Sequence, residues 1–417
     1  MADYQLTVDE DQVAGLFTRD GALAALVERI VQQILEAQVT DYLQAGRYER
    51  TEDRRGYRNG YKPRRLTTRV GTLELRVPQV REGEFSTDLF VRFQRSEQAF
   101  LLALMEMVVQ GVSTRKVTKI TEDLCGTEIA KSTVSALCGR LDPLVTAWNE
   151  RPLSATLYPF LLVDALVLKI REDGRVRARS ALVATGISAT GHREILGLQI
   201  GDSESEASWG AFFQSLKTRG LRGVDLVVSD HHGGLVPAVQ THFQGASWQR
   251  CQTHFTANIL SAAPVDVRRE LKSHLRGLLT AATPQAARAL LQTVHTTFAQ
   301  RAPKALEILD AGFEDAIAVL ALPEPYRVRL RTTNAQERLN EELRRRERVI
   351  RIFPTRDSAL RLLGALLMEW DEQWATGKRY LTMDVYWQWK QQQHQKEQHH
   401  ERAAAPAPHE EEGLQIA

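Results

Sequence analysis

The sequence lacks the features that mark membrane, secreted and disulfide-bonded proteins. No apolar run in its 417 residues approaches the roughly 20 residues of a membrane span, since Leu101–Val109 is short and carries Glu106. The acidic N-terminus has no basic segment leading into an apolar stretch, so we expect no secretory signal. The three cysteines favour a reducing cytoplasm over a disulfide framework. We therefore expect a cytoplasmic protein without a membrane partner.

The chain has little net charge, only +2, but its charges are unevenly distributed. Arg47–Arg69 holds nine Lys and Arg residues against three Asp and Glu residues. A second basic cluster comprises Arg344, Arg345, Arg346, Arg348 and Arg351. Such cationic patches suit a polyanion such as DNA.

The first basic stretch belongs to an N-terminal region, residues 1–95, that we expect to bind DNA. Residues 1–45 show helical spacing, and Thr67–Val70 and Leu73–Val77 predict a hairpin around Gly71. Interleaved Tyr and Arg can stack on bases and neutralise phosphates, although a solvated charged loop is the alternative. The candidate DNA contacts are Arg54, Arg55, Tyr57, Arg58, Tyr61, Lys62, Arg64 and Arg65.

Residues 96–152 predict a second helical region. Ser113 is placed to cap one helix, Gly126 to turn the chain, and Ser132 to begin another helix that reaches Leu141. This spacing resembles a helix-turn-helix, but an ordinary helical hairpin is at least as common. Its candidate DNA contacts are Arg115 and Lys131.

Residues 153–261 are rich in strand signals. Three strands are predicted at Phe160–Arg171, Arg175–Ile187 and Arg193–Ile200, followed by a helix from about Glu206 to Arg219 and a strand at Val224–Ser229. This order describes the opening half of a ribonuclease H-like mixed sheet, an α/β fold. A crossover of this length favours a parallel neighbour, so the first and last strands should lie side by side.

The remaining chain predicts an α-helical insertion at residues 262–328 and completion of the core at residues 329–390. The second part should contain a helix from Asn334 to about Arg346 and helices from about Thr355 to Trp374. Residues 391–417 are rich in Gln, His, Ala, Pro and Glu, so we expect a disordered tail.

Three acidic residues are candidate metal ligands. Asp164 interrupts the apolar run Phe160–Leu168, Asp230 follows a second apolar run, and Glu337 lies near the start of a predicted helix. Burying an isolated carboxylate costs several kcal/mol, about 2–7 or more, unless a cation neutralises it. Paired divalent ions roughly 4 Å apart hold the attacking and leaving oxygens of a phosphoryl transfer. Metal-dependent cleavage and joining of nucleic-acid strands is therefore the predicted chemistry.

Each acid also has a simpler interpretation. Asp164 could be exposed on an edge strand, and Asp230 could cap the following helix. With Asn334 as N-cap, Glu337 could close a capping box, and Glu341, one turn further on, is an alternative ligand.

Four further residues are candidates for a supporting role. Cys251 and His254 have metal-ligand spacing but lack a second pair nearby, so a buried Cys and a hydrogen-bonded His are favoured over zinc. His232 is a plausible neighbour of Asp230. Trp209 is a core aromatic or, as the alternative, a DNA contact.

Taken in order and spacing, these stretches resemble the bacterial transposases of the Mutator type, which mobilise insertion sequences. The stretches that carry the resemblance are residues 56–61, 111–115, 162–165, 229–230, 249–258, 332–337 and 344–354. Each is weak alone, and their combination is highly specific. The resemblance runs from about residue 20 to residue 385.

The resemblance implies an Asp-Asp-Glu triad on a ribonuclease H-like fold with a helical insertion before the Glu. Residue by residue, this triad is Asp164, Asp230 and Glu337, binding two Mg²⁺ (or Mn²⁺) ions. It further implies binding of the element's terminal inverted repeats by the N-terminal region, strand cleavage, transfer to target DNA, and a homodimer or larger assembly on double-stranded DNA. The bound protein would associate with the bacterial nucleoid.

Two other functions stay open from the sequence. One is a catalytically inactive DNA-binding regulator, and the other is a structure-specific nuclease of the same fold that cuts without joining.

Overall fold

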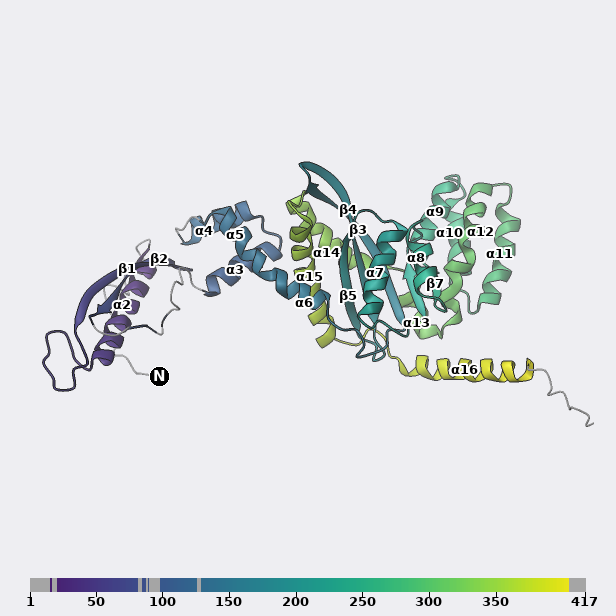
Figure 1. Cartoon of the computed structure of the whole chain (residues 1–417). Helices are drawn as coiled ribbons and strands as arrows, with labels where there is room; N and C mark the ends of the chain where they lie inside the picture. The colour runs from purple at the N-terminus through teal and green to yellow at the C-terminus, as the bar shows by residue number, and fades with distance from the viewer. Residues whose placement is uncertain are drawn as a thin grey trace, which may run out of the picture. The chain divides into compact units, whose positions relative to one another are not determined.

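The computed structural model describes residues 16, 21–81, 85–87, 89, 98–125 and 129–404 (Figure 1). The chain divides into two compact units between Asp142 and Pro143, ten residues before the boundary predicted at 152. No helix within the described ranges combines the length and the hydropathy that a bilayer crossing requires.

The first unit begins with a helix that covers a two-stranded hairpin. Helix α2 (Ala22–Leu43) packs on the antiparallel strands β1 (Arg58–Thr68) and β2 (Gly71–Val80). The turn at Gly71 has a φ of 122°, which favours glycine, so the predicted hairpin is confirmed. Its strands are longer than predicted because the pairing extends back to Arg58, and half of the basic stretch is therefore strand rather than loop.

Three helices complete the first unit, and the pattern of a helical pair is confirmed. They are α3 (Gln98–Val109), α4 (Thr114–Cys125) and α5 (Lys131–Cys138), and a 3₁₀ turn, η1 (Gly139–Leu141), follows. Ser113 caps α4, since its Oγ accepts a hydrogen bond from the Lys116 N–H at 3.3 Å. Helix α5 begins at Lys131, one residue before the predicted Ser132, and the turn predicted at Gly126 lies outside the described residues.

The second unit is built on a five-stranded mixed sheet in the order β5-β4-β3-β6-β7. Its strands are β3 (Phe160–Glu172), β4 (Arg175–Ile187), β5 (Arg193–Gly201), β6 (Leu226–Ser229) and β7 (Ser247–Arg250). Strands β3, β4 and β5 pair antiparallel, whereas β6 and β7 run parallel to β3. The predicted parallel pairing of β3 with β6 is confirmed, and it runs from Phe160 to Leu162.

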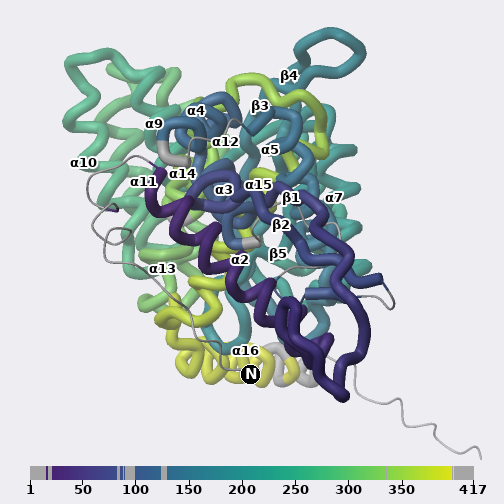
Figure 2. The backbone as a smooth tube through the Cα atoms, turned by 90° about the vertical axis from the view of Figure 1, so that its left-hand side faces the viewer, coloured from purple at the N-terminus to yellow at the C-terminus, as the bar shows by residue number. Residues whose placement is uncertain are grey.

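Successive residues of β3 point to opposite faces, and both faces are covered by helices. Leu161 and Val163 pack against α7 (Glu206–Thr218) and α8 (Leu235–His242). Phe160 and Leu162 belong to a second core that includes the helical segment after β7. Figure 2 shows α10 and α11 on one side of the strands and α7 on the other. Burial on both faces explains the unbroken apolar run of β3.

The stretch predicted as a helical insertion is helical in the structure. Its elements, with the helix that precedes it, are α9 (Gln252–Ala262), α10 (Arg268–Leu279), α11 (Pro284–Phe298), α12 (Pro303–Ile317), the 3₁₀ turn η2 (Ala318–Ala321) and α13 (Glu324–Leu330). Leu271, Leu275 and Leu278 recur at helical spacing and are buried, which is why α10 forms and packs.

Helix α14 (Asn334–Ile350) crosses the sheet near a gap in the pairing of β3. On the side away from β4, and within the described residues, β3 pairs with β6 up to Leu162 and meets Phe353 at Ile170. The Phe353 N–H donates to Lys169 O at 2.8 Å. Between Leu162 and Ile170 this edge of β3 has no strand partner among the described residues, and α14 contacts β3 instead. Asp164 lies in this interval.

Two helices cover the β5 edge of the sheet in the second unit. Helix α15 (Arg356–Thr376) covers the outer strand, where Asp371 Oδ1 accepts a hydrogen bond from the Ile195 N–H at 2.7 Å. On the same edge, Asn149 of α6 (Asp142–Asn149) pairs with both the N–H and the C=O of Leu198 at 2.8 Å. These side chains satisfy an edge that would otherwise offer free backbone groups.

The C-terminal region corrects one expectation. Disorder was predicted from Gln391, but helix α16 runs from Asp384 to Ala404. It is anchored at its start, where Tyr386 is buried and its hydroxyl donates to Asp225. Gln, Glu, Lys and Ala propagate a helix well once a packed first turn nucleates it. Residues 405–417 lie outside the described residues.

Glycine is required at the turn between β4 and β5. Gly191 has a φ of 90°, and a Cβ there would lie 1.8 Å from the carbonyl oxygen of Leu381. Gly174, in the turn between β3 and β4, has a φ of 74°, and a Cβ there would meet no heavy atom of the described residues within 4 Å.

We predict that Gly191→Ala destabilises the protein more than Gly174→Ala. Both substitutions place a Cβ in the left-handed region, at a cost of about 1–2 kcal/mol. Only Gly191→Ala adds the collision with Leu381, at a further ~1–3 kcal/mol. Denaturant unfolding of the two variants measures the difference. Equal losses would show that Gly191 is not closely packed.

Candidate active site

Asp164 lies on β3 two residues beyond Leu162, the last residue that pairs with β6. Both of its carboxylate oxygens accept hydrogen bonds. Oδ1 accepts from the Ala165 N–H at 2.8 Å, and Oδ2 accepts from Asn340 Nδ2 at 2.7 Å. The second bond connects the central strand to α14, the helix that carries Glu337.

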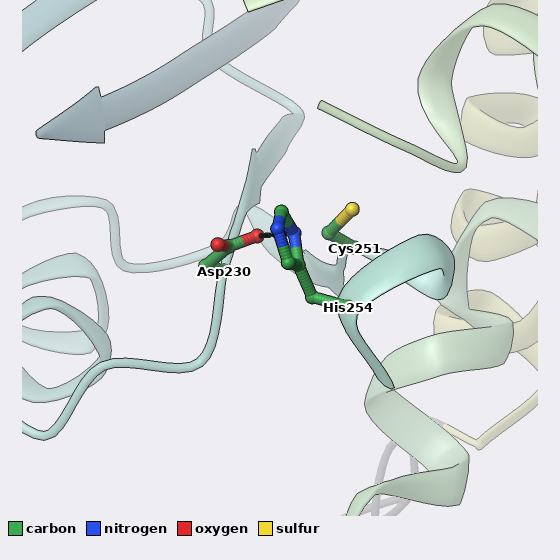
Figure 3. Close-up of side chains that lie close together, drawn as sticks. All are labelled: Asp230, Cys251 and His254. Atoms are coloured by element: carbon green, nitrogen blue, oxygen red, sulfur yellow. Dashed lines mark ion pairs between the residues drawn. The ribbon is translucent and has the colours of Figure 1, made fainter. Parts of the chain in front are cut away.

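Asp230 directly follows β6, at the carboxyl end of the strand. Its Oδ1 lies 2.6 Å from Nδ1 of His254, and Figure 3 shows the imidazole ring facing the carboxylate. Both atoms are inaccessible to solvent, yet the contact does not have hydrogen-bond geometry, so each atom lacks an aligned partner among the described residues. We therefore treat this contact as an ion pair whose polar atoms are incompletely satisfied.

Glu337 reaches the same place from α14. Its Oε1 lies 3.3 Å from Thr333 Oγ1, which donates to it, and 3.7 Å from His254 Nδ1. His254 thus faces both Asp230 and Glu337. Thr333 precedes the first helical residue, Asn334, and provides no side-chain cap, so the capping-box interpretation is wrong.

The three acids therefore converge from β3, from the end of β6 and from α14. Asn340 links Asp164 to the Glu337 helix, and His254 links Asp230 to Glu337. Glu341, the alternative ligand, is exposed. Their roles as ligands stay predictions, but the residues lie where one site could use all three.

Two carboxyls of this group have raised pKa values. Burial, with the charges of Asp230 and Glu204, raises the pKa of Asp164 to about 7. Burial also raises the pKa of Asp230, although the neighbouring His254 opposes the shift. Glu204, in the loop before α7, has a raised pKa because of burial and the charge of Asp230. Negative charge is therefore concentrated here beyond what the nearby cations neutralise.

The donor set fits divalent cations with hard oxygen ligands. Three carboxylates offer oxygens, Asp230 Oδ1 is buried without an aligned hydrogen-bond partner in the described chain, and the carboxyls of Asp164 and Asp230 resist ionisation when no cation is near. A bound cation would relieve each of these costs.

Cys251 and His254 border the same group. Asp230, Cys251 and His254 each place one potential ligand atom within 4.8 Å of the others. The Cys251 thiol is completely buried, accepts from the Thr333 hydroxyl at 3.3 Å, and has a pKa raised by burial. A protonated thiol that fixes the start of α14 matches the favoured structural interpretation.

Sequence reasoning missed the polar residues that hold α14 against the sheet. Asn340 and Gln336 are almost completely buried, and Gln336 Oε1 accepts from Thr185 Oγ1 of β4 at 2.7 Å. They share one helical face with Thr333, at spacings of three and four. A polar residue in a largely polar helix is normally interpreted as solvent-exposed. Only the spacing of Gln336 and Asn340 relative to Glu337 could have indicated that they are buried.

Trp209 and His232, two of the candidate supporting residues, lie in different surroundings. Trp209 is completely buried and stacks on Phe213 with the ring centroids 5.5 Å apart, so it is a core residue and the alternative of a DNA contact is wrong. His232 is half-exposed, with Nδ1 3.6 Å from Glu204 Oε1. It is therefore a neighbour of the acidic group through Glu204.

The predicted DNA contacts differ in how much of each side chain solvent can reach. Arg58 is bound to α2 through Glu36 and Thr40, and the side chain of Arg346 is only 12% exposed. Arg54 lies over the ring of Tyr57 at 4.7 Å, which keeps a cation and an aromatic ring together at the surface. The exposed members of the set are Arg55, Tyr57, Lys62, Arg65, Arg115, Lys131, Arg344 and Arg345, and Arg54, Tyr61 and Arg64 are partly exposed.

We predict that Asp164→Asn stabilises the metal-free protein at pH 8 more than at pH 5. Because the folded-state pKa exceeds the ordinary value of 3.8, the wild type loses stability as pH rises between 3.8 and about 7 and does not regain it above. An amide has no such loss, and Asn340 can turn its own amide to accept from it. Melting temperatures of both proteins in EDTA, compared at the two pH values, measure this effect. A difference independent of pH would show that Asp164 is not shifted.

We predict that Asn340→Ala costs about 1–3 kcal/mol of folding free energy, because it leaves a buried carboxylate oxygen without its donor. Glu341→Ala, on the exposed face of the same helix, is the control and should change stability by less than about 0.5 kcal/mol. Denaturant titrations of both variants measure the change in the free energy of unfolding. Similar values for the two would mean that the bond to Asp164 contributes nothing.

Residues 2–377 match the family described as "Transposase, Mutator family". The chain is 43% identical over 390 residues to the transposase for insertion sequence element IS256 in transposon Tn4001 of Staphylococcus aureus, covering 92% of this chain and 100% of that protein. It is 43% identical over 369 residues to the ISRM5 transposase of Rhizobium meliloti, covering 88% and 92% of the two chains. The IS1081 transposase of Mycobacterium tuberculosis is 39% identical over 364 residues, covering 87% and 88%. The chain therefore belongs to the Mutator family of transposases.

Proposed function

We propose that this protein is the transposase of an insertion sequence, which cuts DNA at the element ends and joins them to target DNA through Asp164, Asp230 and Glu337. The observation that carries the proposal is the convergence of these three acids, linked pairwise by Asn340 and His254. The names of the similar proteins support the same role.

The fold assignment that accompanies this proposal is ribonuclease H-like. It is supported by the strand order β5-β4-β3-β6-β7, with three antiparallel strands followed by two parallel ones. In such a sheet the central strand and its parallel neighbour bring their acids to one edge. A helical insertion between β7 and α14 separates Glu337 from the other two acids in sequence, but Glu337 still lies near them in space.

Asp164, Asp230 and Glu337 would hold two Mg²⁺ or Mn²⁺ ions. When bound, such ions stabilise charge on the attacking and leaving oxygens of a phosphodiester. Oxygen ligands favour these ions over softer metals.

The protein's own residues would prepare this site before DNA binds. Hydrogen bonds from Ala165 and Asn340 fix the two Asp164 oxygens, so the carboxylate does not need to reorient. His254 Nδ1 lies 2.6 Å from an oxygen of Asp230 and 3.7 Å from an oxygen of Glu337, so it restrains both side chains. Such fixed geometry lowers the reorganisation that the reaction requires.

The first unit would bind the terminal repeats of the element. The aromatic and basic side chains of its hairpin region and the exposed Lys131 of α5 support contact with a polyanion. Bringing two element ends together implies a homodimer or a larger assembly. A protein that acts on chromosomal DNA of a bacterium would work in the cytoplasm, at the nucleoid.

We predict that Asp164→Asn, Asp230→Asn and Glu337→Gln each reduce cleavage at the element ends by at least about 10³-fold, because each removes a charge needed only for the reaction. Glu341→Gln, on the same helix, should retain activity. The assay follows a plasmid that carries the chain's own element ends, in Mg²⁺, and separates nicked, excised and joined products.

The products also separate this function from the two alternatives. Tight end binding without cleavage by the wild type would indicate a DNA-binding regulator. Structure-dependent cleavage without joined product would indicate a nuclease. Cleavage that survives Asp164→Asn would refute the role of the triad.

A further inference from the structure

Two arginines lie over one aromatic ring on the second unit, outside the triad, and the charge of a third acts on one of them. The guanidinium carbon of Arg193 lies 4.5 Å from the centre of the Tyr380 ring and 4.1 Å from that of Trp374. The guanidinium of Arg329 lies 4.8 Å from the same Tyr380 ring. The charge of Arg338, on α14, also acts on the pKa values of Arg193 and Tyr380. We call these three arginines with Tyr380 and Trp374 the arginine cluster.

The arginine cluster lacks a negative counterpart in the described part of the chain. None of its arginines forms an ion pair with a carboxylate there. Burial and the repulsion of Arg329 and Arg338 lower the pKa of Arg193, and the opposing influence is the Tyr380 hydroxyl, not an acid. The cluster is therefore a concentration of positive charge that the protein itself does not neutralise.

Two other arginines of the same unit are neutralised by acids. Arg151 pairs with Asp371 at 3.0 Å, and Arg356 pairs with Glu172 at 2.6 Å. A partly buried guanidinium without an acid partner is costly unless a ligand brings the charge. Stacking on aromatic rings holds the guanidinium plane and leaves its N–H edge available to an anion.

Sequence and packing relate the cluster to the helix that carries Glu337 and to one face of the sheet. Arg338 is the residue after Glu337 in α14. Tyr380 packs against the core that lies on the Phe160 and Leu162 face of the sheet, the face that also carries Asp164 and Asn340. Arg193, at the start of β5, lies opposite Ile187 in the adjacent strand.

We propose that the arginine cluster of Arg193, Arg329 and Arg338 is a phosphate-binding site that holds the backbone of a DNA strand as it leaves the active site. Planar guanidiniums suit phosphodiester oxygens because they offer two parallel donors. Arg329 of α13 and Arg338 of α14 are exposed, so a DNA strand can reach both of them. The inference rests on the proposed function and adds a substrate contact to it.

The test compares DNA binding by the full chain and by an Arg329→Gln/Arg338→Gln double variant. Binding of a short fluorescent duplex of arbitrary sequence is measured in EDTA over a range of salt concentrations, so no reaction occurs. Each phosphate contact contributes about 0.9 to the slope of log K against log salt, so the double variant should lose roughly 1.8. Arg288→Gln is the control, since Arg288 is an exposed arginine that pairs with Glu314 at 2.7 Å. Its slope should stay that of the wild type.

Arg193 is tested separately because it is partly buried. Arg193→Lys keeps the charge but loses the planar fork, so it should weaken duplex binding at constant slope, whereas Arg193→Gln should also lower the slope. Circular dichroism melts identify any variant that fails to fold.

The outcomes distinguish DNA from free phosphate as the ligand. They also distinguish failure of this inference from failure of the proposed function. If the double variant retains the wild-type slope, the cluster does not bind DNA. If it loses binding of inorganic phosphate, measured by calorimetry, but retains the duplex slope, the cluster is a free-anion site and the DNA assignment is wrong. If the wild type itself fails to bind the duplex, the proposed function fails rather than this inference.

Discussion

Burial of negative charge at the centre of the sheet is the constraint on which the second unit depends. Asp164 lies on β3 two residues beyond the pairing with β6, and Asp230 directly follows β6. Burial, with the charges of Asp230 and Glu204, raises the pKa of Asp164 to about 7. A fold optimised for stability alone would place apolar residues there. Strain of this kind supports the proposal that cations bind between these carboxylates.

Helix α14 positions Glu337, the third acid of the group. Its buried polar face contacts β4 through Gln336 and β3 through Asn340, and these bonds fix the rotation and the height of the helix on the sheet. Glu337 lies beside that face and is thereby aimed at His254 and Asp230. The helical insertion packs in one core with the Phe160 and Leu162 face of the sheet. The chain can therefore separate its acids widely in sequence and still bring them together.

Much of the fold could be predicted, because its signals are local. The alternation and apolar runs of β3 to β6, the glycine at the hairpin turn and the helical periods after residue 262 each reflect one element. The parallel pairing of β3 with β6 followed from the length of the crossover. The bond between Asn340 and Asp164 and the arginines around Tyr380 could not be predicted, since they join residues far apart in sequence. The prediction of disorder was wrong for Gln391–Ala404. The polar composition of this stretch suggested disorder, but the helix is fixed at its start by the bond from the Tyr386 hydroxyl to Asp225.

Crystals of the protein grown with Mn²⁺ and a duplex of its element end would test the central claim most directly, because anomalous scattering locates the ions. We expect two ions between the carboxylates of Asp164, Asp230 and Glu337, roughly 4 Å apart. A single ion held by Cys251 and His254, with Asp164 and Glu337 left uncoordinated, would contradict the proposed chemistry.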